Sequence, residues 1–326
     1  MPKLTQEEIE QLMGRALDLL AEEDDEEALS IAAQLMEAEV PEGFSLAASV
    51  NESLQQGDEA KAILINGIAK FPDHWEFYVP LAELESQSGN TEQALAYLDK
   101  AESLPDNMPD YVNLHRAVTY SRVGEFEKAL GLLEQVEDME LVVPAINLQV
   151  KVLYDMGRFD LIIELANEKE ELIAMAENES ETFALGEIHT LIADAYLQED
   201  EDEASATEHI YIALEFDRTQ IDALDLLRRI KNMTSEKAKP FSLLVSGRFA
   251  EGILEEGEDP NFITSYVVMA ESPEEALELV RDFETDDIDG ESLRILEVSE
   301  EELDDEDDKL KGVVMASELG MLSIEE

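Results

Sequence analysis

Apolar and polar positions in the first two thirds of the chain repeat with the period of an amphipathic helix. Within each stretch, small and large apolar residues recur three or four positions apart, and a short polar turn separates one stretch from the next. This pattern predicts six helix pairs within residues 1–218. The first pair is expected at 6–21 and 25–38 and the second within 41–72. The second helix of the fifth pair is expected to run past the usual repeat length.

Glycines mark the predicted turns inside four of these pairs. Gly57, Gly89, Gly124 and Gly157 lie 32, 35 and 33 residues apart, and the text around them is alike: QQGDEAKA, QSGNTEQA, RVGEFEKA and DMGRFDLI. A period of this length, with a helical pattern on both sides of a turn, is typical of stacked helix–turn–helix arrays. We therefore expect an all-α fold, an α-solenoid in which each pair buries its apolar face against its neighbours.

The third and fourth pairs have the most regular pattern. The main repeat positions, with the turn glycine of the fifth pair, are Tyr78, Ala82, Gly89, Ala94, Ala101, Tyr120, Gly124, Ala129 and Gly157. The alanines are expected at helix crossings, where a small side chain lets two helix axes approach.

These positions resemble the tetratricopeptide repeat family over residues 8–218, although Glu85 stands where the family has an aromatic residue. More narrowly, the chain is similar to the acidic, cytosolic tetratricopeptide proteins of low-GC Gram-positive bacteria. The resemblance implies an interaction scaffold that binds a protein or peptide in a concave groove, which the first helices of the repeats line.

On this resemblance, the candidate groove residues lie on the first helices of the fourth and fifth pairs: Tyr111, Leu114, Val118, Arg122, Asn147, Lys151 and Tyr154. Arg122 and Lys151 are notable because basic residues are scarce. Either they pair with a carboxylate of the ligand, or they neutralise neighbours such as Glu83, Glu85 or Asp155. The second interpretation is favoured, because unpaired like charges on facing helices are destabilising.

One subgroup of the family clamps the C-terminal carboxylate of heat-shock chaperones with a set of Lys, Asn and Arg residues. The corresponding face of the third pair carries Glu76, Val79 and Glu83, which do not match that set. An acidic groove favours a basic or amphipathic peptide instead.

Residues 219–326 have a less regular pattern. We expect degenerate helical repeats that cap the array, with a terminal helix at 308–319 and an acidic exposed segment at 299–309. The stretches 241–249 and 263–269 are rich in β-branched residues and allow short strands. A helix that begins at Pro273 is strongly indicated, since Ser272 can cap it and Glu275 can complete a capping box.

Charge and composition narrow the classes of partner. The chain has 80 acidic and 22 basic residues, which gives a net charge of −58. This charge disfavours nucleic acid and anionic membranes as partners. It either favours basic partner proteins or only keeps the outer helix faces solvated.

The absence of cysteine excludes disulfides, thiolate metal sites and cysteine nucleophiles. The start MPKLTQEEIE is not a signal peptide, and no apolar run approaches the roughly 20 residues that span a bilayer. A cytoplasmic protein is therefore expected.

One segment partly matches a calcium-binding loop. If Gly290 takes the sixth position of the loop, Asp287 and Asp289 fall on ligand positions, but Thr285 and Leu296 occupy two positions that require acids. An acidic turn that caps the following helix is the favoured interpretation. The histidines lack the spacing of metal ligands and are expected at the surface or in the groove; they are His74, His115, His189 and His209.

No glycine-rich dinucleotide or phosphate loop and no nucleophile elbow occurs, so neither a cofactor nor catalysis is expected. The leading hypothesis is a non-enzymatic scaffold. The alternative is an acidic chaperone, or an electrostatic mimic, that holds basic proteins such as unassembled ribosomal proteins. A third hypothesis, an enzyme with its site in the C-terminal region, has no reactive constellation to support it.

Overall fold

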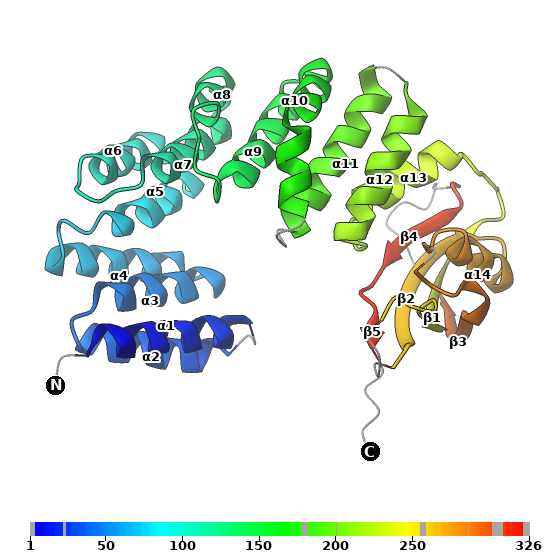
Figure 1. The fold of residues 1–326 in the computed structure, drawn as a ribbon, viewed down its shortest axis with the longest axis horizontal. Helices are drawn as coiled ribbons and strands as arrows, with labels where there is room; N and C mark the ends of the chain where they lie inside the picture. The colour runs from blue at the N-terminus through cyan, green and yellow to red at the C-terminus, as the bar shows by residue number, and fades with distance from the viewer. Residues whose placement is uncertain are drawn as a thin grey trace. The chain divides into compact units, whose positions relative to one another are not determined.

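The computed structural model describes residues 4–21, 24–177, 182–199, 201–254, 259–285, 287–301 and 309–321. The chain forms two compact units, Met1–Val152 and Leu153–Glu326. The first unit is a series of helix pairs (Figure 1). Its helices are α1 (Gln6–Ala21), α2 (Asp25–Glu37), α3 (Pro41–Ser53), α4 (Gly57–Lys70), α5 (Tyr78–Gln87), α6 (Thr91–Glu102), α7 (Pro109–Arg122), α8 (Phe126–Leu133) and the start of α9 (Val142–Asp155), with the short 3₁₀ helix η1 (Trp75–Phe77) before α5.

The turns inside the second to fifth pairs each contain one residue in the left-handed region. This residue is Gly89, Gly124 or Gly157 in three pairs, with φ of 78°, 74° and 66°, as the glycine pattern predicts. In the second pair the left-handed residue is Gln55, with φ of 59°, and Gly57 begins α4. The left-handed residues are therefore 34, 35 and 33 residues apart, a more regular period than the glycines alone give.

The predicted small residues lie at the helix contacts. Ala82, Ala94, Ala101 and Ala129 are at most 1% exposed. The aromatic and large residues Trp75, Tyr78 and Leu98 pack in the same cluster as the first three of these alanines. The predicted stacking of helix pairs is therefore confirmed, because a buried methyl at each of these positions leaves room for the facing helix.

The second unit begins with more helices: α10 (Phe159–Glu177), α11 (Thr182–Glu199), α12 (Glu203–Phe216) and α13 (Ile221–Lys231). The predicted long helix is α10, and α11 with α12 forms the predicted sixth pair. The predicted boundary at 218/219 falls inside this unit, between α12 and α13. As a domain boundary it stays a prediction.

The rest of the second unit is not a set of helical repeats, and that expectation was wrong. The described residues contain an antiparallel sheet with strand order β3-β1-β2-β4, and β5 also pairs with β2 (Figure 1). Its elements are β1 (Lys239–Arg248), β2 (Asn261–Ala270), α14 (Pro273–Arg281), η2 (Gly290–Ser292), β3 (Arg294–Glu300), β4 (Gly312–Ala316) and β5 (Gly320–Met321). The two stretches that allow strands are β1 and β2.

The expected terminal helix at 308–319 is also wrong, because β4 lies there. Gly312 has φ of 134°, which a right-handed helix does not allow, and the β-branched Val313 and Val314 follow it. The helix predicted at Pro273 is confirmed as α14, whose cap Ser272 accepts a hydrogen bond from the amide of Glu275. Most of the predicted acidic segment, residues 302–308, lies outside the described residues.

Helices α13 and α14 pack on one face of the sheet. Leu243 and Val245 of β1 and Tyr266 and Val268 of β2 point to this face and are at most 1% exposed. One continuous buried cluster joins these side chains to residues of α11, α12, α13 and α14. The helices before the sheet and the sheet itself therefore share a core within this unit.

Candidate protein-binding face

Acidic side chains from the first helices of successive pairs meet on one face of the first unit. The carboxylate of Glu83 on α5 lies 3.9 Å from the guanidinium of Arg122 and 3.9 Å from Nδ1 of His115, both on α7. Burial raises the pKa of Glu52 on α3, and the negative charge of Glu83 raises it further. We define the α3–α5–α7 face as the surface formed by Glu52, Glu76, Glu83, Tyr111, His115 and Arg122.

Aromatic rings border this face beside the carboxylates. The ring of Tyr111 meets Trp75 edge-on, with centroids 6.0 Å apart, and lies 4.6 Å from the ring of His115. Burial raises the pKa of Tyr111, and the charges of Glu83 and Glu76 raise it further. The phenol therefore stays protonated at neutral pH and offers a hydrogen-bond donor. Burial lowers the pKa of His115, so its imidazole is neutral.

The charge balance of the face is negative. Three carboxyl groups share it with one guanidinium, and Glu83 and Arg122 are each 36% exposed. Exposed ion pairs contribute at most about 1 kcal/mol, and a separation of 3.9 Å is loose. A cation from a partner can therefore compete with Arg122 for Glu83 at little cost in stability.

The residues predicted on α7 divide into two sets. Tyr111, Val118 and Arg122 lie with His115 along one stripe of the helix, with the spacing i, i+4, i+7 and i+11. Leu114 is only 9% exposed and belongs mainly to the core. Arg122 lies beside Glu83, one of the acids that it was predicted to neutralise.

Glu85, the exception to the repeat pattern, is not part of this face. It is buried, and it accepts hydrogen bonds from Lys61 on α4 and, at 2.8 Å, from the side-chain amide of Asn90. The hydrogen bond from Lys61 holds the pKa of Glu85 below its usual value. A polar contact between two successive pairs thus replaces the expected aromatic side chain.

The remaining predicted residues lie on α9. Asn147 and Lys151 are half-buried. Tyr154 donates a hydrogen bond to Asp194 on α11, and this bond raises the pKa of Tyr154 to about 12. Its hydroxyl therefore links the last turn of α9 to α11 within the second unit. A binding role for these three residues stays a prediction.

Two histidines that sequence reasoning placed at the surface or in the groove form a buried contact instead. Nδ1 of His189 on α11 lies 2.8 Å from Nδ1 of His209 on α12, and the two rings stack. Tyr196 stacks on His209, and Phe216 stacks on His189. Burial, with the nearby His209, lowers the pKa of His189 to about 4. We call these four stacked rings, Tyr196, His209, His189 and Phe216, the ring column. The spacing of apolar residues in the sequence does not indicate it.

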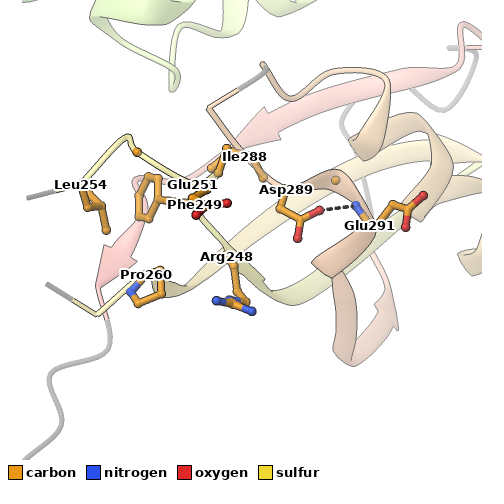
Figure 2. Close-up of a pocket in the computed structure, with 11 residues that line it drawn as sticks. Arg248, Phe249, Glu251, Leu254, Pro260, Ile288, Asp289 and Glu291 are labelled. Carbon is orange, nitrogen blue, oxygen red and sulfur yellow. Dashed lines mark hydrogen bonds between the residues drawn. The ribbon is translucent and has the colours of Figure 1, made fainter. Parts of the chain in front are cut away.

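A hollow of about 870 Å³ lies at the end of the sheet in the second unit (Figure 2). Phe249, Leu254 and Ile288 form its apolar walls, and Arg248 with several acids forms its polar rim. The carboxylate of Asp289 accepts a hydrogen bond from the amide of Glu291 and caps η2. The expected acidic turn is therefore confirmed in the described part of 285–297. No group of three potential metal ligands occurs among the described residues.

None of the described helices is both long and apolar enough to cross a membrane.

Comparison with solved structures finds proteins of similar structure but low sequence identity. The APC/C hetero-tetramer Cut9–Hcn1 aligns with a TM-score of 0.53 and 16% identity, covering 68% of this chain and 42% of that chain, less than half of its length. PilW, a type IV pilus biogenesis factor, aligns with a TM-score of 0.53 and 15% identity, covering 69% of this chain and all of that chain. A tetratricopeptide repeat protein from Parabacteroides merdae aligns with a TM-score of 0.49 and 15% identity, covering 71% of this chain and 87% of that chain.

No protein-family model matches the chain, and no curated protein matches its sequence. At identities of 15–16%, the structural likenesses show the fold alone. The helix pairs of this protein have the fold of a tetratricopeptide-like α-solenoid.

Proposed function

We propose that this protein is a non-enzymatic interaction scaffold whose α3–α5–α7 face binds a basic or amphipathic segment of another protein. The α-solenoid fold supports a binding role, because stacked helix pairs present an extended surface made of many first helices. A cytoplasmic location is part of the same proposal.

The observation that carries the proposal is the position of Glu83. Its carboxylate lies 3.9 Å from both His115 and Arg122, and its negative charge helps to raise the pKa of Glu52 on α3. A lysine or arginine side chain bound here would relieve the repulsion between the two carboxyl groups. Tyr111, which packs edge-on against the buried Trp75, offers an aromatic ring to the apolar part of the same segment.

The test compares two variants with the same change in net charge. Glu76→Gln with Glu83→Gln alters the α3–α5–α7 face, and Glu92→Gln with Glu127→Gln alters exposed positions on the second helices α6 and α8. The probe is a fluorescein-labelled helical peptide with lysines on one face and leucines on the other. Its affinity is measured by fluorescence anisotropy near 0.1 M salt, where charges separated by more than about 10 Å are screened.

We expect the face variant to bind the peptide about tenfold more weakly and the outer variant to bind it almost as the unmodified protein does. An equal loss in both variants would support the alternative, a chaperone or mimic that holds basic proteins through total charge. The net charge of −58 is the observation that favours this second function. Unchanged binding in both variants would contradict binding at the α3–α5–α7 face.

A further inference from the structure

The outer edge of β3 is open in the described part of the sheet. β3 pairs with β1 on one side, and no described strand pairs with its other side. Leu296 and Val298 on this strand are 51% and 47% exposed. Exposed apolar residues on an edge strand are unusual, because open edges recruit other chains.

The backbone of β3 also has hydrogen-bonding groups directed outward. The amide of Glu301, just after the strand, donates to the carbonyl of Pro240. Since amide direction alternates along a strand, the amides of Glu300 and Val298 are directed away from β1. They are the groups that a further strand would pair with.

The charge around this edge limits what can pair with it. Glu297 and Glu300 lie on β3, and Glu301 follows the strand directly. Two copies of the chain, each with a net charge of −58, would repel each other. The edge therefore disfavours a second copy and favours a strand of opposite charge.

We propose that β3 accepts an extended segment of a partner protein as an added antiparallel or parallel strand, and that this segment alternates basic and apolar residues. The register supports the alternation. Val298 lies opposite Leu243 and shares the face that packs on the helices, whereas Glu297 lies opposite Leu244 on the other face. An added strand with apolar residues beside Val298 therefore carries its basic residues beside Glu297.

This surface lies in the second unit, and its partner segment is extended rather than helical. It goes beyond the α3–α5–α7 face and does not depend on it. Amide hydrogen exchange distinguishes the two binding surfaces. A segment bound to β3 protects amides of β3, whereas a segment bound to the α3–α5–α7 face protects amides of α5 and α7.

The probe is a peptide of alternating lysine and valine, added to the full-length chain. Amide hydrogen exchange is measured residue by residue, and we expect exchange at Val298 and Glu300 to slow about tenfold. The same peptide with an N-methyl group on every amide keeps its charge but cannot form a ladder through either edge. We expect it to bind about tenfold more weakly, because several backbone hydrogen bonds are lost.

A pair of variants tests the location of the binding site. Val298→Arg changes β3, and Met315→Arg makes the same change at an exposed position on β4, the opposite edge of the sheet. We expect Val298→Arg to weaken binding about tenfold and Met315→Arg to change it less than twofold. If Val298→Arg does not fold, the N-methylated peptide still decides the question on the unmodified protein.

Equal binding of the methylated and unmethylated peptides would overturn the proposal, since it would show attraction by charge alone. Protection of α5 and α7 without protection of β3 would also overturn it. Equal effects of Val298→Arg and Met315→Arg on peptide binding would overturn it as well.

Discussion

Lys61 on α4 donates a hydrogen bond to Glu85 on α5, and only 4% of Glu85 is exposed. Asn90, in the turn before α6, donates to the other oxygen of the same carboxylate. One repeat later, Tyr120 occupies the position that corresponds to Glu85. A buried polar contact therefore connects three successive helices at a site where the repeat normally uses a ring.

Replacement of Glu85 by alanine removes the acceptor of both hydrogen bonds. We expect the free energy of unfolding to fall by about 1–2 kcal/mol, less than for a fully buried pair, because Lys61 is 38% exposed and can turn to water. Urea denaturation measures the change, and Glu92→Ala on the exposed surface of α6 is the control. The pKa of Glu85 is lowered in the folded state, so this contribution is present above pH 4.5 and is lost as the pH falls below that value. Equal stability of the two variants would contradict the role given to Glu85.

The helix crossings predict a contrast between two alanines on α6. Ala94 is fully buried, whereas Ala96 is exposed. We expect Ala94→Leu to lower the free energy of unfolding by about 1–3 kcal/mol through overpacking, and Ala96→Leu to change it by less than about 0.5 kcal/mol. Thermal or urea unfolding of the two variants checks this contrast. If Ala94→Leu does not lower the free energy of unfolding, α6 does not pack closely against its neighbours at Ala94.

The ring column predicts a loss of stability at mildly acidic pH. The pKa of His189 falls from 6.5 to about 4 on folding, so the unfolded chain binds more protons between these values. Stability is therefore complete above pH 6.5 and decreases as the pH falls toward 4, by about 2–3 kcal/mol.

The measurement is the free energy of unfolding in urea at a series of pH values from 7 down to 5, above the range in which most carboxylates titrate. We expect the His189→Gln variant to show a flatter profile in this window than the unmodified protein. Identical slopes would show that His189 does not titrate in the way the buried contact requires.

Tyr154 predicts an effect on stability that is separate from peptide binding. Its hydroxyl donates to Asp194, and the pKa of Tyr154 rises to about 12. We expect Tyr154→Phe to lower the free energy of unfolding by about 1–2 kcal/mol, because the carboxylate of Asp194 loses a donor. We also expect spectroscopic titration to show one fewer tyrosine with a high pKa. If Tyr154→Phe does not change the free energy of unfolding, the hydrogen bond to Asp194 does not stabilise the fold.

The helix pairs could be predicted from sequence because their contacts are local and periodic. Ala94 and Ala129 are buried where the pattern places them, and Gly89 and Gly124 adopt the left-handed conformation that a turn glycine predicts. Gln55 shows the limit of this approach, since a residue other than glycine takes the same conformation and shifts the apparent period.

The sheet was harder to predict because its partners are distant in sequence. β3 is exposed along nearly its whole length and pairs with β1 about 50 residues earlier, so its local pattern has no clear period. The contact of His189 with His209 was missed for a similar reason, because it joins two helices whose apolar stripes did not include either residue. On the candidate face, the scarcity of basic residues draws attention to Arg122, but the central position of Glu83 follows only from the coordinates.

The most direct test of the central claim is photo-cross-linking in cells that express the protein. A photoreactive amino acid replaces Val118, which lies between His115 and Arg122 on α7, or Ile65, which is 49% exposed on the second helix α4. Our account predicts that position 118 yields a discrete cross-linked protein, that Glu76→Gln with Glu83→Gln abolishes this product, and that position 65 yields none. The same products from both positions, or a product at 118 that persists when the two carboxylates are neutralised, would contradict it.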